Sequence, residues 1–369
     1  MEEDKKMKKL LALILVLSIA LFAFVGCAKE QPAPAPSPAP SEEPNEEPSE
    51  EPNEEEPAAE GAVKTGLAVI TSLGKSKDAT ADAEGTAQSD SVIVAVTVDN
   101  DGKVVKAVID TAQTAIKFNA EGKVTSDLTA SYKSKQELKE EYGMSKASTI
   151  GKEWYEQANT LADYVVGKTV EEIKAIPTDD TGVPTDADLV ASVTMKIDGY
   201  KNAFEKAMAE AQDLGASAED KLGLGVVTTI DKSKDATADA DGLAQAYSTY
   251  TATTFDAEGK ITSSILNASQ ANVNFDATGK ITSDLAAPAL TKNELGDDYG
   301  MKKASPIGKE WYEQAAAFAE YIVGKTVEEV KAFETDETGH NTEADIVSSV
   351  TFGIDHFTLI LDEALNTAK

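Results

Sequence analysis

The chain has 369 residues, 41% hydrophobic and 27% charged, which is enough for about two domains with their own cores. Its 65 acidic residues outnumber 34 basic ones, and the formal net charge of -31 argues against nucleic-acid binding because phosphate backbones would be repelled. One cysteine, two histidines and no arginine exclude disulfides, iron-sulfur clusters and thiol catalysis from the folded region, and leave lysine, hydroxyls, backbone amides or a covalent bond to hold any phosphate.

Residues 1–27 have the layout of an export signal. The stretch "MKKLLALILVLSIALFAFVGC", which ends at Cys27, joins a lysine-rich head, an apolar run and small residues before the cysteine. This pattern predicts a lipoprotein signal peptide in which Cys27 is lipidated and anchors the protein to the extracellular face of the cell membrane. An uncleaved membrane helix is the alternative. The acidic "MEED" leaves the true start open between Met1 and Met7.

Residues 28–65 are rich in proline and clustered glutamate. Such a composition cannot bury enough apolar surface to fold, and its like charges repel one another. We therefore expect a disordered, extended tether between the anchor and the folded part.

The rest of the chain is an internal duplication. "KSKDATADAEG" recurs as "KSKDATADADG" (from 75 to 232), and "GKEWYEQA" recurs unchanged (from 151 to 308), each after the same offset of 157 residues. This predicts two tandem homologous domains at 66–212 and 222–369, joined by a linker at 213–221.

Each half has strand patterns followed by helix patterns. In the first half, "SVIVAVTVDNDGKVVKAVID" places two β-rich runs around an Asp-Gly turn, and "IKFNAEGKVTSDL" repeats the device. "SKQELKEEY" opens with a serine cap, and "GKEWYEQANTLADYVV" and "DGYKNAFEKAMAEA" carry apolar stripes at helical spacing. The predicted fold class is α+β, with an antiparallel sheet packed against helices in each half.

The stretches "DADLVASVTMKID" and "EADIVSSVTFGID" are a second repeated feature near the end of each half. Leu189, Ala191 and Val193 alternate with Val190, Ser192 and Thr194, as in a short strand that Asp188 precedes. On this pattern alone, a plain strand before the last helix is the simplest interpretation. The candidates for chemistry are the two threonines, Thr194 and Thr351.

These stretches resemble the flavinylation motif of the FMN-binding domain family, which runs aspartate, two residues, Ser or Thr, Gly, Ala and the acceptor Thr. The resemblance implies that FMN phosphate is esterified to Thr194 and Thr351. In both halves serine stands for the motif glycine and valine for its alanine, and in the first half Ala191 also stands for the motif Ser or Thr, where the second half has Ser348. The matching positions are Asp188 and Asp345 for the aspartate and Ser192 and Ser349 for the glycine.

The wider chain resembles the PplA-type flavoprotein lipoproteins of Gram-positive bacteria, through its lipobox, tandem units, "KSKDATADADG", "YGMKKASPIGKEWYEQA" and "VGKTVEEVK". The resemblance implies two covalent FMN groups installed by a separate flavin transferase. It also implies electron transfer from a membrane quinone-linked donor to extracellular acceptors such as ferric iron, by a carrier rather than a turnover enzyme. The leaders of such proteins are similar to sources of small peptide pheromones.

Further repeated residues are candidates for contact with the flavin ring. They are Met144 and Met301, Trp154 and Trp311, and Gln113 and Gln270. Helix starts expected at Gly151 and Gly308 would offer amides that favour negative charge. For the tryptophans, a core role is the alternative.

Two other functions stay open at this point. One is a surface lipoprotein that binds a solute or a cation without a redox role. The other is a precursor whose signal peptide is released as a pheromone.

Overall fold

The computed structural model describes residues 61–369, so the predicted signal peptide, Cys27 and the tether up to residue 60 lie outside the described residues. We call residues 61–212 repeat 1 and residues 221–369 repeat 2. Repeat 1 contains β1 (Lys64–Ser72), β2 (Gly85–Val98), β3 (Val104–Phe118), α2 (Lys135–Leu138), η1 (Lys139–Tyr142), η2 (Met144–Lys146), α3 (Trp154–Tyr164), α4 (Val170–Lys174) and α5 (Asp198–Ala209). Repeat 2 contains β4 (Lys221–Thr229), β5 (Gly242–Phe255), β6 (Ile261–Phe275), α6 (Lys292–Leu295), η3 (Gly296–Tyr299), η4 (Met301–Lys303), α7 (Trp311–Tyr321), α8 (Val327–Lys331) and α9 (Asp355–Thr367).

Each repeat is a three-stranded antiparallel sheet with helices, which confirms the α+β class. The strand orders are β1-β2-β3 and β4-β5-β6. The turn between β2 and β3 forms where predicted, because the Asp99 carboxylate accepts the amides of Asp101 and Lys103 and Gly102 adopts a positive φ of 74°. The second hairpin predicted after this one is reduced to a single bridge between Phe118 and Val124.

Both repeats keep their own core between the sheet and the helices. In repeat 1 the predicted stripe of α3 is buried, namely Trp154, Ala158, Leu161 and Ala162, followed by Val165. The serine cap predicted before α2 is also present, since Ser134 and Glu137 form a capping box.

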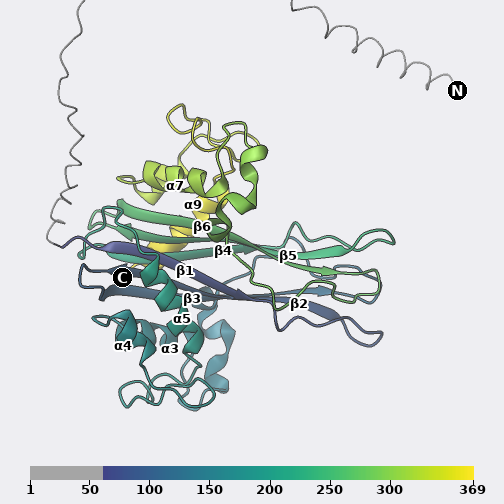
Figure 1. Cartoon of the computed structure of the whole chain (residues 1–369), viewed down its shortest axis with the longest axis horizontal. Helices are drawn as coiled ribbons and strands as arrows, with labels where there is room; N and C mark the ends of the chain where they lie inside the picture. Colours follow the sequence, from purple (N-terminus) through teal and green to yellow (C-terminus); the bar gives the residue numbers. More distant parts are fainter. Residues whose placement is uncertain (1–60) are drawn as a thin grey trace, which may run out of the picture. The chain divides into compact units, whose positions relative to one another are not determined.

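The inner faces of the two sheets pack against each other, and the helices cover the outer faces (Figure 1). One shared cluster joins Leu67, Val69 and Ile93 of repeat 1 to Leu224 and Tyr250 of repeat 2. Another shared cluster lies at the far ends of the long strands. The described residues belong to a single compact unit.

The repeated "KSKDATADA" loops connect the repeats reciprocally. The Asp78 carboxylate accepts the amide of Ile281 at 2.8 Å, and the Asp235 carboxylate accepts the amide of Val124 at 2.9 Å. Asp78 and Asp235 are equivalent residues, as are Val124 and Ile281. Each loop therefore completes the turn after the last strand of the other repeat.

The strand predicted around Leu189 is wrong. The segment forms successive helical turns, in which the amide of Val190 donates to the carbonyl of Asp186 and that of Val193 to Leu189. Leu189 and Val193 are fully buried, whereas Ala191 is exposed. Leu189 and Val193 are four residues apart, which puts both on one side of a helical turn. Residues four apart also share one face of a strand, so over so short a stretch the sequence pattern does not distinguish the two structures.

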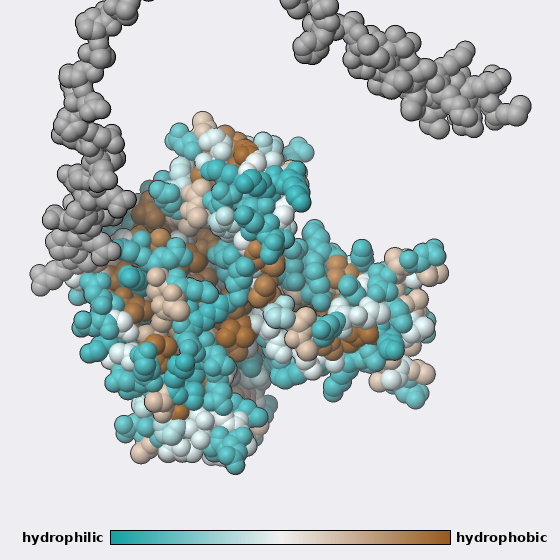
Figure 2. Space-filling model, viewed as in Figure 1, coloured by the Kyte–Doolittle hydropathy of each residue, from teal (hydrophilic) through white to brown (hydrophobic). Residues whose placement is uncertain are grey.

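Hydrophilic residues cover most of the face seen in Figure 2, with smaller apolar patches between them. Within residues 61–369, no helix combines the length and apolar character needed to cross a membrane.

Candidate functional site

Thr351 directly follows the helical turns of its segment, and a buried amide fixes its position. The Thr351 backbone amide donates to Gln314 Oε1 at 2.8 Å, and its Oγ1 donates to the same oxygen at 3.0 Å. Gln314, on α7, is fully buried, and its Nε2 donates to Ser305 Oγ and to the carbonyl of Lys309. These donors fix which way the Gln314 amide points, so its oxygen faces Thr351.

Thr194 has the same arrangement in repeat 1. Its backbone amide and Oγ1 donate to Gln157 Oε1 at 2.8 Å and 3.3 Å. Gln157 is also fully buried, and its Nε2 donates to Ser148 Oγ. Both threonines are half-buried.

Gln157 and Gln314 were not singled out from the sequence. A signal was present, because each lies next to an alanine of the apolar stripe in "GKEWYEQA" and is itself a buried polar residue. Buried polar groups need partners, and here the partner is the threonine.

A pocket of about 370 Å³ opens next to the segment that carries Thr351, although Thr351 itself is not one of its lining residues. It brings together three of the predicted ring-contact residues, Gln270, Met301 and Trp311. Phe352 and Gly353, the two residues after the threonine, form another part of its wall. Its size lies at the lower end of the usual range for small-molecule sites.

Aromatic side chains form much of this pocket. The rings of Trp311 and Phe352 have centroids 5.9 Å apart and planes inclined by 28°. Trp311 is only 3% exposed and belongs to the core of repeat 2, so it is both a core residue and a wall of the pocket.

Lys292 is the central charged group of the pocket. Its Nζ lies 4.8 Å, 4.7 Å and 5.0 Å from the ring centroids of Tyr247, Tyr299 and Trp311, and it donates to the Tyr247 hydroxyl at 3.2 Å. Burial lowers the pKa of Lys292 to about 8. Burial, together with Tyr299, raises the pKa of Tyr247 to about 12. Lys292 was missed because "TKNEL" reads only as a helix cap.

Repeat 1 brings together a related set with different chemistry. Lys135 lies over the rings of Tyr142 and Trp154, at 4.5 Å and 5.4 Å. Trp154 is 3% exposed, and its Nε1 donates to the Tyr200 hydroxyl at 3.3 Å. Met144 packs against the same core cluster.

The repeats also differ on their central strands. Gln113 pairs in register with Asp90, which forms an ion pair with Lys75 at 2.7 Å. At the equivalent place in repeat 2, Gln270 pairs with Tyr247. An ion pair in repeat 1 is thus replaced by an aromatic ring in repeat 2.

The motif aspartates and serines lie further out. Asp188 and Asp345 are exposed, and Asp345 does not line the pocket beside Thr351. Ser192 and Ser349 are half-buried, and their amides donate to carbonyls within the same helical turns at 2.8 Å.

The anion site predicted at the helix starts is wrong. The helices begin at Trp154 and Trp311, three residues after Gly151 and Gly308. In repeat 2 the carboxylate of Glu310, 3% exposed, caps α7 and accepts the amide of Met301 at 2.8 Å. Glu153 does the same in repeat 1. The protein's own carboxylate occupies the position that an external anion would need.

Among residues 61–369 there is no group of three or more His, Cys, Asp or Glu side chains placed to bind a metal ion.

Comparison with known proteins gives one partial similarity. A stretch of 41 residues is 56% identical to a chlorophenol reductase of Desulfitobacterium hafniense, and covers 11% of this chain and 12% of that protein. No protein-family model and no solved structure matches the chain.

Proposed function

We propose that the protein is a membrane-anchored extracellular electron carrier that holds FMN covalently on Thr351 and Thr194. The observation that carries the proposal is the position of Thr351, which is half-buried, oriented by Gln314, and directly followed by two residues that line a pocket containing aromatic rings and a lysine. The resemblance of both threonine segments to a flavinylation motif supports the same assignment.

The residues present fit such a group. Trp311 and Phe352 offer aromatic faces to a planar ring, and Gln270 and Lys292 offer hydrogen-bond donors to its polar edge. FMN, when bound, would supply one- and two-electron chemistry, which this protein's side chains do not provide. In repeat 1, Trp154, Gln113 and Lys135 would take the corresponding roles.

A covalent bond also suits the physical setting. A protein outside the cell loses a reversibly bound cofactor to dilution, because occupancy needs free ligand near its dissociation constant. Without arginine, the chain cannot hold a phosphate by a bidentate guanidinium contact. An ester to a threonine removes both difficulties.

The partners follow from the proposal. A flavin transferase would attach the FMN, a quinone-linked membrane protein would donate electrons, and ferric iron or another extracellular acceptor would receive them. The lipid on Cys27, outside the described residues, would keep the protein at the membrane surface.

The second candidate function is reversible binding of a solute. It is supported by a larger pocket of about 530 Å³ on the outer side of repeat 2, where Leu214, Leu266 and Ala319 meet Asn293 and Glu320. A protein of this kind would need no covalent group.

Intact-mass measurement after coexpression with a flavin transferase distinguishes the two candidates. We expect a mass gain of two FMN groups that survives denaturation, one fewer in either Thr351→Val or Thr194→Val, and none in the double variant. Thr278→Val, an exposed threonine outside the motif, is the matched control and should keep both groups. An unmodified mass, obtained while the transferase modifies a known acceptor, would contradict the proposal.

A further inference from the structure

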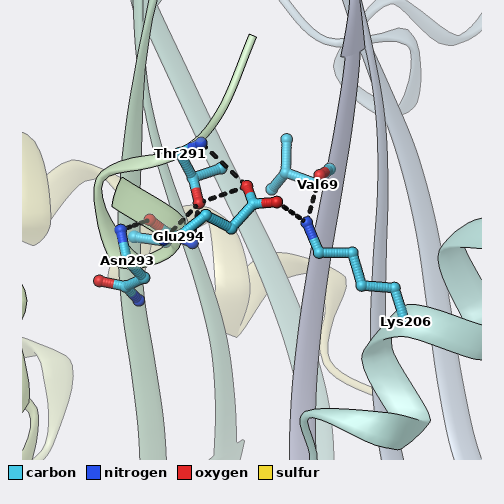
Figure 3. A network of polar contacts seen from close by, with 6 residues as sticks. Val69, Lys206, Thr291, Asn293 and Glu294 are labelled. Carbon is cyan, nitrogen blue, oxygen red and sulfur yellow. Dashed lines mark hydrogen bonds and ion pairs between the residues drawn. The ribbon is translucent and has the colours of Figure 1, made fainter. Parts of the chain in front are cut away.

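An ion pair joins the last helix of repeat 1 to the pocket side of repeat 2. Lys206, on α5, donates from Nζ to Glu294 Oε1 at 2.6 Å and to the carbonyl of Val69 at 3.1 Å (Figure 3). The other oxygen of Glu294 accepts the backbone amide and the hydroxyl of Thr291, at 2.9 Å and 2.7 Å. One carboxylate therefore both caps α6 and binds a lysine of the other repeat.

The short helix α6 carries Lys292, the lysine of the pocket beside Thr351. Lys292 lies between the two capping residues, Thr291 and Glu294, and is 5% exposed. The position of Lys292 among its three aromatic neighbours thus depends on a turn that Lys206 holds from the other repeat.

In repeat 2, the hydrogen bond between the last helix and the first strand has its donor and acceptor exchanged. Glu363, on α9, stands where repeat 1 has Lys206, and it accepts the backbone amide of Val226 at 2.8 Å, where Lys206 donates to the carbonyl of Val69. Glu137, the equivalent of Glu294, caps α2 through the amide of Ser134 and forms no hydrogen bond to Glu363. The helix α2 carries Lys135, the corresponding lysine of repeat 1.

We propose that Lys206, on the last helix of repeat 1, positions the pocket lysine of repeat 2 through Glu294, which caps the helix that carries Lys292. Glu363 forms no corresponding link to Glu137, so the coupling between the repeats is not symmetric. Lys206 does not line the pocket, so it is a positioning residue. The inference concerns the chain's own side chains and holds whatever ligand the pocket takes.

The charges around the two contacts agree with this asymmetry. Burial raises the pKa of Glu363 to about 8, and the carboxylates of Glu137 on α2, Asp110 on β3 and Asp362 on α9 add to the rise, against the Val226 amide. Burial alone would raise the pKa of Glu294, but the hydrogen bonds from Lys206 and Thr291 outweigh it and the pKa is lowered.

Amine acylation followed by peptide mass spectrometry tests the proposal on the full chain produced without flavin transferase. Rates for Lys292 and Lys135 are normalised to the rate of the exposed Lys103. Lys206→Gln should raise the relative rate at Lys292 several-fold and leave Lys135 unchanged. Lys206→Arg should restore the protection of Lys292.

Glu363→Gln is the matched variant at the equivalent position of repeat 2 and should leave both relative rates unchanged, because Glu363 forms no hydrogen bond to Glu137. Circular dichroism shows whether each variant is folded. In folded variants, an unchanged Lys292 rate in Lys206→Gln would overturn the proposal.

Discussion

Phe118 and Phe275 stack face to face, with ring centroids 4.2 Å apart and ring planes inclined by 7°. They are equivalent residues at the ends of β3 and β6, so the approximate two-fold relation between the repeats passes between their rings. Both rings are fully buried, and a Cβ on Gly85 or Gly242 would come within 2.4 Å or 2.6 Å of them. Only glycine at these two positions leaves enough room for the two stacked rings.

Phe118→Ala should destabilise both repeats together. Truncating a buried phenylalanine costs about 3–5 kcal/mol, and the cavity would open in a cluster that both repeats share. We expect a single urea transition that moves to lower denaturant, followed through circular dichroism and tryptophan fluorescence. Phe275→Ala is the matched variant and should behave alike. Two separate transitions would show that the repeats unfold independently.

Asp110→Asn should stabilise the protein above neutral pH. Burial raises the pKa of Asp110 to about 7, opposed by hydrogen bonds from Ser134, Gln136 and Thr111. The folded state therefore holds a proton that the unfolded state releases between about pH 4 and pH 7, and the free energy of unfolding falls across that interval.

Repeat 2 already contains this substitution, because Asn267 is the equivalent residue and its Nδ2 donates to Thr291 Oγ1 at 3.1 Å. We expect a gain on the order of 1–3 kcal/mol at about pH 8 and little change at about pH 4, measured by urea unfolding. Asn267→Asp should lose stability at about pH 8. A gain in Asp110→Asn that is equal at both pH values would argue against a buried, protonated Asp110.

Gln314→Met should impair modification of Thr351 specifically. Methionine has a similar length but no amide, so the Thr351 amide and hydroxyl lose their shared acceptor. The unfolding free energy should fall by about 1–3 kcal/mol, the usual cost of a buried unsatisfied group. After coexpression with the transferase, peptide mass spectrometry should find FMN on Thr194 and less on Thr351. Gln157→Met should give the reverse distribution, and equal loss at both threonines would contradict the assignment.

Lys292→Met should lower the flavin midpoint potential of repeat 2. A positive charge near the ring favours the reduced, more negative form, and Lys292 lies in the pocket beside Thr351. The measurement is a spectroelectrochemical titration in a Thr194→Val background, which leaves one flavin. Because burial lowers the pKa of Lys292 to about 8, the difference from the unsubstituted lysine should shrink as that group loses its proton above about pH 8. A potential that does not move below that pH would place the ring away from Lys292.

Much of the fold could be predicted because its signals are local. The duplication, the turn at Gly102, the cap at Ser134 and the stripe of α3 each depend on a few neighbouring residues. Packing of one sheet on the other was not predicted. A signal existed in "VIVAV" of β2, a continuous apolar run typical of strands covered on both faces.

The candidate site was partly predictable for a similar reason. Gln270, Met301 and Trp311 stand out because they recur in both repeats, and all three line the pocket. Lys292 and Gln314 recur too, but a capped lysine and a helical glutamine look ordinary until the fold shows how deeply they are buried. From the sequence, Asp345 was a candidate site residue because it matches the motif aspartate. The structure leaves its side chain exposed.

The back-to-back arrangement of the sheets sends the two threonine sites to opposite sides of the protein, because each site lies on the helix-covered outer face of its own sheet. A donor and an acceptor could then dock at the same time without competing for the same surface. Packed sheets are usually about 10 Å apart, so electrons exchanged between the sites would have to tunnel through at least that thickness of tightly packed side chains.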